Sequence, residues 1–249
     1  MTRRTVLVTG GAKRLGAAIV RRLAAGGHRV VIHYGTSADA AEALAGEVGA
    51  AGTVAGDLAQ LDAIGDLWTR ACEVASGPID GLVNSASLFA FDRPEAVDTG
   101  LAARLYEVNC TAPVLLAGAL AGQGGGGAVV NLLDQKLANP NPDFFSYTLS
   151  KAALAHATTL MAQAFAPKVR VNAVAPGLTL PSGDQGAAEF DRVARANLLD
   201  RPVGAAAVAD GVAYLLGAES VTGQTLFVDC GQRFVRRDGD VMFEERARG

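Results

Sequence analysis

Residues 5–16 read TVLVTGGAKRLG, and this stretch decides the fold class. Its β-branched start, Thr5–Thr9, predicts a strand, and the Ala- and Leu-rich segment Leu15–Ala25 predicts a helix. Glycines between a strand and a helix let the backbone approach a pyrophosphate, whose charge then lies at the helix N-terminus. An ordinary glycine-rich turn looks similar, but the place after the first strand favours phosphate binding. The expected phosphate-binding residues are Gly10, Lys13, Arg14, Leu15 and Gly16.

Composition excludes several classes of protein. The chain has 249 residues, of which 50% are hydrophobic, enough for one large core rather than two. A net charge of -3 without a long basic run argues against a nucleic-acid partner. The longest apolar stretch, around Val114–Ala121, is expected to be too short to span a membrane. Three widely spaced cysteines favour neither disulfides nor a metal site, so we expect a cytoplasmic protein.

Short β-branched runs alternate with Ala- and Leu-rich segments of helical length. The expected strands are Thr5–Thr9, Arg29–His33, Gly52–Gly56, Gly81–Asn84, Ala128–Leu132, Arg170–Val174 and Thr225–Val228. The expected helices are Leu15–Ala25, Ala38–Val48, Leu61–Ala75, Leu101–Ala121, Phe145–Ala166 and Ala206–Leu216. This alternation predicts an α/β fold: a single-domain, Rossmann-type, doubly wound parallel sheet of about seven strands with helices on both faces.

The domain is expected to span residues 1–231, followed by a C-terminal arm over residues 232–249. Within the domain, residues 175–200 form a long, weakly patterned stretch. Loops of that length in a compact domain are usually lids or binding loops, so we expect this one to border the substrate.

The end of the second strand carries information about the cofactor. Residues 32–37 read IHYGTS and contain no Asp or Glu. A site selective for a free ribose 2′-hydroxyl normally places an acid there, whereas positive charge and hydroxyl groups suit a 2′-phosphate. We therefore expect NADPH, the alternative being that these are solvated loop residues. The expected contacts are Lys13, Arg14, His33, Tyr34, Thr36 and Ser37.

Further candidate residues follow later strands. Asp57 follows the third strand, where its carboxylate can reach an adenine amino group, and small residues at 84–86 follow the fourth; both segments are also compatible with simple turns. Asn109 lies in an apolar helix, where a buried polar side chain needs a partner. The expected cofactor contacts are Asp57, Leu58, Asn84, Ser85, Ala86, Pro176 and Gly177.

Residues 146–151 read SYTLSK, which places Tyr147 and Lys151 one turn apart on the same helix face. A free phenol has a pKa of about 10 and exchanges protons poorly at neutral pH. A nearby ammonium favours the phenolate, so Lys151 is expected to lower the pKa of Tyr147 towards the working range. An isolated pair of this kind is more often a surface tyrosine beside a solvated lysine.

Together these motifs resemble the short-chain dehydrogenase/reductase family, from Thr5 to Gly231. They occur in the family's order: residues 9–16, Asp57, residues 84–86, Asn109, Tyr147 with Lys151, and residues 176–177. The resemblance implies catalytic roles for Asn109, Tyr147 and Lys151, with Lys151 also holding the nicotinamide ribose. It further implies a homotetramer built on helices such as Leu101–Ala121 and Phe145–Ala166.

At two positions the chain differs from the family's usual residues and resembles the pteridine reductase branch, which includes dihydrobiopterin and dihydromonapterin reductases. Asp134 stands where the family usually has a serine, and Arg14 where it usually has a glycine. Phe89 matches an aromatic residue that stacks on the pterin, and Ser87 a serine that bridges cofactor and pterin. The branch's Gly-Leu-Ser segment corresponds to Gly177, Leu178 and Thr179, which implies cofactor contacts there. Weaker matches are Thr36, Ser85 and Cys230, where the branch often has a basic residue, an asparagine and a glycine.

The chemistry of Asp134 agrees with this branch. A carbonyl-reducing site needs a hydroxyl donor to the developing oxyanion, whereas an ionised aspartate only accepts hydrogen bonds and would repel it. Pterins present NH groups that a carboxylate can accept, and a C=N bond to reduce. Hydride would pass to a ring carbon, and the Asp134–Tyr147–Lys151 group, or solvent, would protonate the adjacent nitrogen. The implied substrate contacts are Arg14, Ser87, Phe89, Asp134 and Tyr147.

Two other functions stay open at this point. One is a reductase of ketones or quinones in which Asp134 merely tunes Tyr147, and the other is a non-catalytic NADPH-binding protein. Asp134 could also simply shape the loop after the fifth strand.

The arm over residues 232–249 is strongly charged yet contains large apolar residues such as Phe234 and Phe243. In the pteridine reductases the C-terminus of one subunit helps line a neighbour's pocket. We therefore expect the arm to pack across a subunit interface, with Arg233 or Arg236 bordering a neighbouring site.

Overall fold

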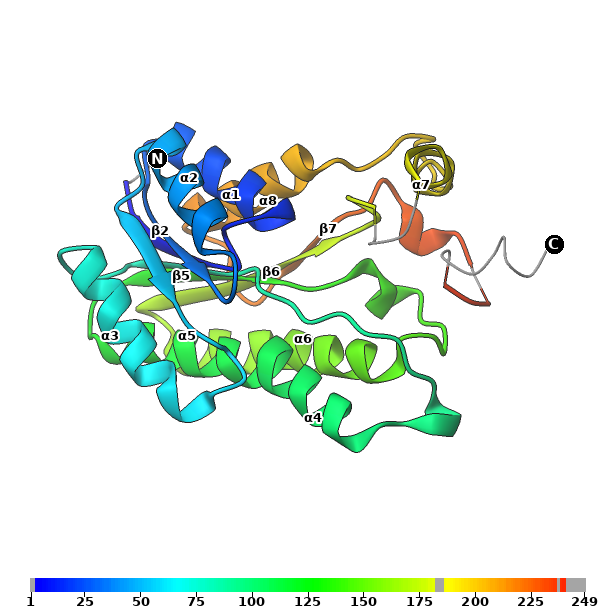
Figure 1. Cartoon of the computed structure of the whole chain (residues 1–249), viewed down its shortest axis with the longest axis horizontal. Coiled ribbons are helices and arrows are strands. Elements are labelled where there is room, and N and C mark those ends of the chain that lie inside the picture. Colours follow the sequence, from blue (N-terminus) through cyan, green and yellow to red (C-terminus); the bar gives the residue numbers. More distant parts are fainter. Residues whose placement is uncertain (1–2, 182–185, 237, 241–249) are drawn as a thin grey trace.

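The computed structural model describes residues 3–181, 186–236 and 238–240. One sheet of seven parallel strands has the order β3-β2-β1-β4-β5-β6-β7 (Figure 1). The strands are β1 Thr5–Thr9, β2 Arg29–Tyr34, β3 Gly52–Ala55, β4 Gly81–Asn84, β5 Gly127–Leu132, β6 Val169–Pro176 and β7 Thr225–Val228. Each lies where the sequence predicts it, with ends shifted by at most two residues, and the predicted fold class is confirmed.

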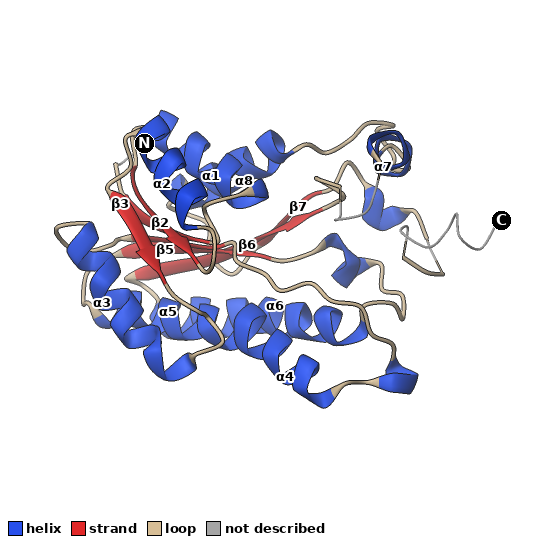
Figure 2. Ribbon diagram, viewed as in Figure 1, coloured by secondary structure: helices blue, strands red, loops and turns tan. Residues whose placement is uncertain are grey.

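Helices cover both faces of the sheet (Figure 2). The α-helices are α1 Arg14–Ala25, α2 Ala38–Val48, α3 Ile64–Val74, α4 Thr99–Tyr106, α5 Ala112–Gly122, α6 Phe145–Phe165, α7 Ala187–Ala194 and α8 Ala205–Gly217. Short 3-10 turns are η1 Leu61–Ala63, η2 Pro94–Ala96, η4 Gln135–Ala138 and η5 Gln232–Phe234. Helices α1, α2 and α8 pack on one face, and α3, α5 and α6 on the other.

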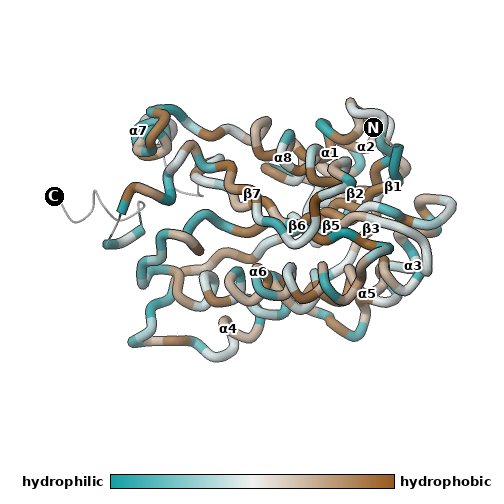
Figure 3. Tube along the Cα trace, turned by 180° about the vertical axis from the view of Figure 1, so that it is seen from behind, coloured by the Kyte–Doolittle hydropathy of each residue, from teal (hydrophilic) through white to brown (hydrophobic). Residues whose placement is uncertain are grey.

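Each face has its own hydrophobic core, because the strands of a parallel sheet are buried on both sides. Val8 and Ile32 join the α1 side, whereas Leu7 and Leu82 join the α3 side, and all four are fully buried. Figure 3 shows this hydrophobic layer through the middle of the molecule. The alternation of side chains along each strand thus divides one apolar run between two cores.

Two features differ from the sequence-based expectation. The helix expected at 101–121 is interrupted by a π-helical turn, η3 Glu107–Thr111, which carries Asn109. The long loop expected at 175–200 contains a short helix, α7, while its residues 182–185 lie outside the described part of the chain. Neither feature has a periodic signal of its own, since a π turn adds only one residue to a helical repeat.

The helical run Thr99–Gly122 is long and apolar enough to cross a membrane by length and composition alone. The expectation that this region is too short was therefore wrong, because α4, η3 and α5 join into one helix. Core helices meet the same criterion, and Leu105, Leu116 and Leu120 of this run are buried inside the protein. Leu116 and Leu120 of α5 pack against the sheet, and Leu105 of α4 packs beside Phe144 and Tyr147.

His33 connects the ends of three strands. Its Nδ1 accepts a hydrogen bond from the backbone N–H of Gly10 at 3.2 Å, and its Nε2 donates to the carbonyl of Gly56 at 3.1 Å. The side chain is 2% exposed, and burial lowers its pKa from 6.5 to about 4. The expectation that His33 supplies positive charge to a 2′-phosphate was therefore wrong: the ring is neutral and holds the phosphate loop in place.

This burial predicts a pH-dependent stability. Because the folded-state pKa lies below the unfolded value, the unfolded chain takes up the proton first as pH falls. The contribution of neutral His33 is complete above pH 6.5 and is lost towards pH 4, where the pKa shift corresponds to about 3 kcal/mol. Between pH 7 and 4 we expect the unfolding free energy of the wild type to fall by about that much more than that of His33→Gln.

Denaturant titrations at several pH values measure this difference. His156→Gln, at an exposed histidine, serves as the control and should follow the wild type. Parallel curves for the wild type and His33→Gln would contradict the assignment.

Candidate active site

Two adjoining cavities lie at the carboxyl edge of the sheet and share Gly10, Lys13, Ala86 and Ser87. The smaller encloses about 350 Å³ and the larger about 510 Å³. The expected residues that line the smaller are Gly10, Lys13, His33, Tyr34, Thr36, Ser37, Asp57, Leu58, Ala86 and Ser87. Those that line the larger are Gly10, Lys13, Arg14, Leu15, Gly16, Ser85, Ala86, Ser87, Phe89, Asp134, Tyr147, Lys151, Pro176, Gly177, Leu178 and Thr179. Only two expected residues, Asn84 and Asn109, line neither cavity.

The phosphate loop is shaped by close backbone approaches. Gly10 has a φ of 62°, and a Cβ there would lie 2.8 Å from Cα of Ala86, so only glycine fits. Arg14 also adopts a positive φ, 52°, which explains why a glycine is the expected residue at this position. Lys13, at the N-cap of α1, makes no side-chain cap. The first N–H groups of α1 therefore suit an anionic ligand, as a dinucleotide phosphate would require.

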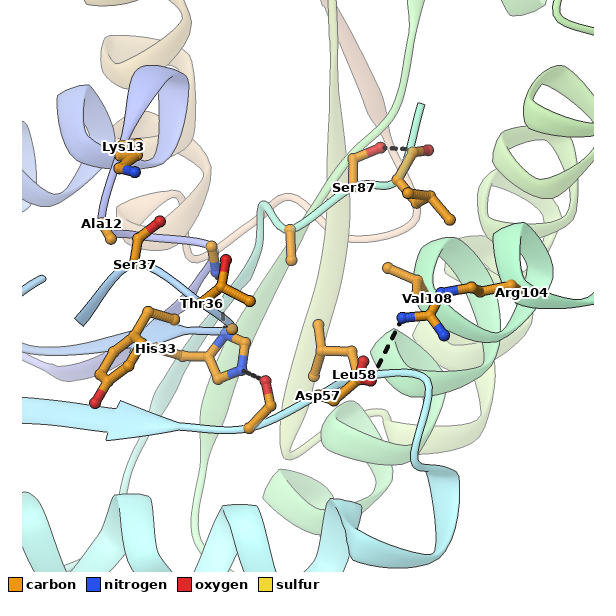
Figure 4. Close-up of a pocket in the computed structure, with 16 residues that line it drawn as sticks. Ala12, Lys13, His33, Thr36, Ser37, Asp57, Leu58, Ser87, Arg104 and Val108 are labelled. Atoms are coloured by element: carbon orange, nitrogen blue, oxygen red, sulfur yellow. Dashed lines mark hydrogen bonds and ion pairs between the residues drawn. The ribbon is translucent and has the colours of Figure 1, made fainter. Parts of the chain in front are cut away.

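The smaller cavity has a different character at each end (Figure 4). Lys13, Thr36 and Ser37 lie on one side, where charge and hydroxyl groups suit a phosphate. On the other side, Asp57 lies opposite Arg104 of α4, with Asp57 Oδ2 accepting from the guanidinium at 3.4 Å. A flat polar base fits between these walls better than a second anion, because Asp57 would repel it.

The larger cavity holds three coupled titratable side chains. The Tyr147 hydroxyl donates to Asp134 Oδ2 at 2.9 Å, and Asp134 Oδ1 accepts the backbone N–H of Lys136 at 2.8 Å. Lys151 Nζ lies 5.9 Å from the centroid of the Tyr147 ring and donates a hydrogen bond to the carbonyl of Leu132 at 2.8 Å. Tyr147 and Lys151 are both buried.

Burial dominates the protonation of this group. It raises the pKa of Tyr147 well above its ordinary value, an effect that the charge of Asp134 strengthens. Burial also raises the pKa of Asp134 and lowers that of Lys151 to about 8. The expectation that Lys151 lowers the pKa of Tyr147 was therefore wrong, because Asp134 is the partner of the hydroxyl. Tyr147 keeps its proton at neutral pH and can donate it.

An aromatic cluster forms the wall next to Tyr147. The Phe89 ring stacks on Phe144 with centroids 4.2 Å apart and meets Tyr147 edge-on at 4.7 Å. Phe89 is 45% exposed, so one side of its ring is open to the cavity. Phe144 is buried and has a φ of 52° directly before α6, which orients the start of the helix that carries Tyr147. The cluster can accept a flat aromatic ligand by stacking.

Asn109 is fully buried in the π turn and makes four hydrogen bonds. Its Oδ1 accepts from the Leu88 backbone N–H at 2.8 Å and from the Ser87 hydroxyl at 3.2 Å. Its Nδ2 donates to the Leu88 carbonyl and to the Ser150 hydroxyl. These bonds fix the segment that places Ser87 and Phe89, so in this structure Asn109 acts by positioning.

Asn84 faces the core instead of a cavity. Its Nδ2 donates to Oδ1 of Asn131 at 2.9 Å, and Asn131 in turn donates to the Thr158 hydroxyl. The Asn84 side chain therefore belongs to the core, while the expected approach of a cofactor to the backbone of residues 84–86 stays a prediction. This buried polar chain links the adjacent strands β4 and β5 to α6.

The segment 176–181 is fixed by contacts from distant parts of the chain. The N–H of Leu178 donates to Gln232 Oε1 at 2.8 Å, and a Cβ at Gly177 would lie 2.6 Å from that same atom. Arg14 donates through Nη2 to the carbonyl of Pro181 at 2.7 Å. The phosphate loop, the start of the long loop and η5 thus meet at the mouth of the larger cavity.

The described part of the C-terminal arm contacts its own chain. Arg233 forms an ion pair with Asp229 at 3.0 Å and stacks on Phe227, whereas Arg236 is exposed and lies 3.8 Å from Asp238. The N–H of Asp240 donates to the carboxylate of Asp143 at 2.8 Å. Residues 237 and 241–249 lie outside the described part, so packing of the arm across an interface stays a prediction.

Sequence reasoning missed two contributors. Arg104 lines the smaller cavity, and Gln232 fixes the start of the long loop. Arg104 and Val108 are four residues apart on one helix face, and this spacing could have placed Arg104 beside the cavity. Gln232 lies beyond the last strand, and no local pattern indicates its long-range contact.

Comparison with known proteins agrees with this geometry. A solved structure of FolM alternative dihydrofolate reductase 1 from Brucella suis, in complex with NADP, has a TM-score of 0.89 and 42% identity, covering 94% of this chain and 96% of the other. Pteridine reductase 1 of Leishmania tarentolae is 32% identical, and L-xylulose reductase of Bos taurus 35% identical, each over 92% of this chain and 96% of the relative.

The sequence model described as short chain dehydrogenase matches residues 4–190. This match spans the sheet from β1 through β6, the phosphate loop and the Tyr147–Lys151 pair. The chain therefore belongs to the short-chain dehydrogenase family.

Proposed function

We propose that this chain is an NADPH-dependent reductase of a pterin-type C=N bond, with a dihydropterin or dihydrofolate-type substrate. Family membership makes it an oxidoreductase, and the finer assignment rests on one observation. In the larger cavity the Tyr147 hydroxyl donates to a carboxylate, Asp134, rather than to a serine hydroxyl. A carboxylate there recognises N–H donors on the substrate and disfavours a developing oxyanion.

The cofactor assignment is supported by the shape and charge of the site. The Gly10 cradle, which any Cβ would fill, and the free N-terminus of α1 fit a pyrophosphate. Lys13, Thr36 and Ser37 suit a 2′-phosphate, and no carboxylate ends β2 to repel it. The Brucella suis relative was solved in complex with NADP, which agrees with these contacts.

Bound NADPH would supply hydride to a ring carbon of the C=N bond. The electron pair of that bond moves to the nitrogen, which then takes one proton. Tyr147 keeps its proton at neutral pH and is hydrogen-bonded to Asp134, whose own pKa is raised by burial. The pair therefore holds a transferable proton next to the cavity, and Lys151 stabilises the charge on Asp134.

The substrate end suits a flat, hydrogen-bonding heterocycle. Phe89 offers an open ring face, Arg14 lies at the cavity mouth, and Ser87 borders both cavities. A pterin combines an aromatic ring system with a row of N–H donors and nitrogen acceptors. Such a molecule can stack on Phe89 while Asp134 accepts its hydrogen bonds.

A ketone, ketose or quinone reductase is the second candidate. The similarity to an L-xylulose reductase favours it, because that relative covers as much of this chain as the pteridine reductase does. In this alternative Tyr147 alone would protonate the oxygen. Asp134 argues against it, since its charge would oppose the alkoxide that forms.

A substrate panel tests the proposal. We expect NADPH oxidation with dihydropterins or dihydrofolate, and a much lower kcat/KM with xylulose or quinones. Asp134→Asn keeps the shape but loses the charge, so turnover of the dihydropterin should fall about 10²–10⁴-fold, the range of a positioned acid–base group, without loss of NADPH affinity.

Three results would separate the candidates. Faster reduction of a ketose or quinone than of any pterin would overturn the assignment. Asp134→Asn acting like the wild type would leave the carboxylate without a chemical role. NADPH binding without turnover of any substrate would support a non-catalytic binding protein.

Tyr147→Phe tests the proton donor. The variant keeps the ring contact with Phe89 but loses the hydroxyl that donates to Asp134. We expect turnover to fall about 10²–10⁴-fold while the NADPH dissociation constant stays within a few-fold. Turnover close to that of the wild type would show that the proton comes from solvent instead.

We further propose a homotetramer. Large apolar side chains are exposed along the helical run Thr99–Gly122 and along α6, namely Tyr106, Leu115, Leu149 and Leu160, each 42–53% exposed. Such a surface on two neighbouring helices suits burial against a second copy.

Light scattering tests this assembly. We expect four times the chain mass of 25.4 kDa at micromolar concentration. Leu160→Asp, on the exposed side of α6, should lower that mass, whereas Leu198→Asp, away from these helices, should not. A monomeric wild type would contradict the proposal.

A further inference from the structure

We propose that Arg104 holds the adenine base of the cofactor in the smaller cavity. This inference rests on the NADPH-binding role proposed above. Arg104 belongs to α4, lines the cavity together with Val108 one turn later, and reaches across to Asp57 beyond β3 (Figure 4). Two segments nearly fifty residues apart in sequence thereby close the same end of the cavity.

The ion pair itself does not explain why an arginine stands here. Its side chain is 56% exposed and that of Asp57 44%, and the two are 3.4 Å apart. An exposed, loosely aligned pair contributes little to folding stability. The ion pair thus leaves the Arg104 side chain 56% exposed at the cavity, where the guanidinium plane can lie against an aromatic base.

Asp57 and Arg104 form a matched pair for such a base. Asp57 Oδ1 accepts the backbone N–H of Ala59 at 3.0 Å, which fixes the carboxylate, while Oδ2 faces Arg104. The carboxylate can accept an exocyclic amino group, and the guanidinium can stack on the ring or donate to a ring nitrogen. Leu58 and Val108 supply apolar contact between them.

The charges at this end favour the base over the 2′-phosphate. The negative charge of Asp57 offsets the positive charge of Arg104, so the carboxylate would repel a phosphate placed there. Lys13, Thr36 and Ser37, on the other side of the cavity, have no such acid beside them in the lining of this cavity. Arg104 should therefore strengthen binding of any adenine dinucleotide, with or without the 2′-phosphate.

Binding measurements with three probes test this role. We expect Arg104→Leu to weaken NADPH and NADH by the same factor, about five- to thirtyfold, as for the loss of one cation–π contact. Reduced nicotinamide mononucleotide, which lacks adenine, should bind as it does to the wild type. Arg104→Lys keeps the charge but not the planar group and should show an intermediate loss. Arg21→Leu, which removes an exposed ion pair between Arg21 of α1 and Glu47 of α2, is the matched control and should bind all three probes normally.

Several outcomes would overturn the inference. A loss confined to NADPH would assign Arg104 to the 2′-phosphate, and an equal loss for the mononucleotide would show a general disturbance of the site. Unchanged affinity for NADPH and NADH would show that Arg104 does not contact the base. Because no pterin enters these measurements, failure of the substrate proposal would leave the result on Arg104 intact.

Discussion

The active site depends on a close contact between the ends of β1 and β4. The hydroxyl of Thr9, buried at the end of β1, accepts the backbone N–H groups of Ser85 and Ala86 at 3.0 and 3.1 Å. Gly10 then packs directly against Ala86. The strand order reverses between β1 and β4, where ligands of doubly wound sheets bind. Both cavities include Gly10 and Ala86, so this contact forms part of the wall of each.

The buried titratable side chains of the larger cavity lower the stability of the fold. Asp134, Tyr147 and Lys151 all lose hydration, and burial is the largest influence on the pKa of each. A fold selected for stability alone would replace them with apolar side chains of similar volume. Buried titratable groups in a cavity, with pKa values shifted in opposite directions, are instead the usual sign of proton-transfer chemistry. The same low polarity that shifts these groups also strengthens the hydrogen bond from Tyr147 to Asp134.

Sequence reasoning predicted what depends on periodicity and on order along the chain. All seven strands and the parallel sheet followed from alternating β-branched and Ala-rich segments, and the phosphate loop from its glycines. Predictions were wrong where the outcome depends on the direction in which a side chain points and on how deeply it is buried. His33 looked like a phosphate ligand but is turned inward between Gly10 and Gly56. The expected effect of Lys151 on the pKa of Tyr147 was also wrong, because sequence spacing cannot show that Asp134 accepts the hydrogen bond of the hydroxyl. The cytoplasmic location stays a prediction.

The two ends of the site are built from different parts of the chain, and this division bears on specificity. The smaller cavity is lined by residues up to Val108 only. The larger cavity adds Asp134, Tyr147 and the segment after β6, which is tied to Arg14 and to Gln232. Substrate preference can therefore change through the later segments while the dinucleotide end stays intact. In the function proposed above, the carboxylate of Asp134 next to Tyr147 is such a change, because a carboxylate only accepts hydrogen bonds and would disfavour a negative charge on the substrate.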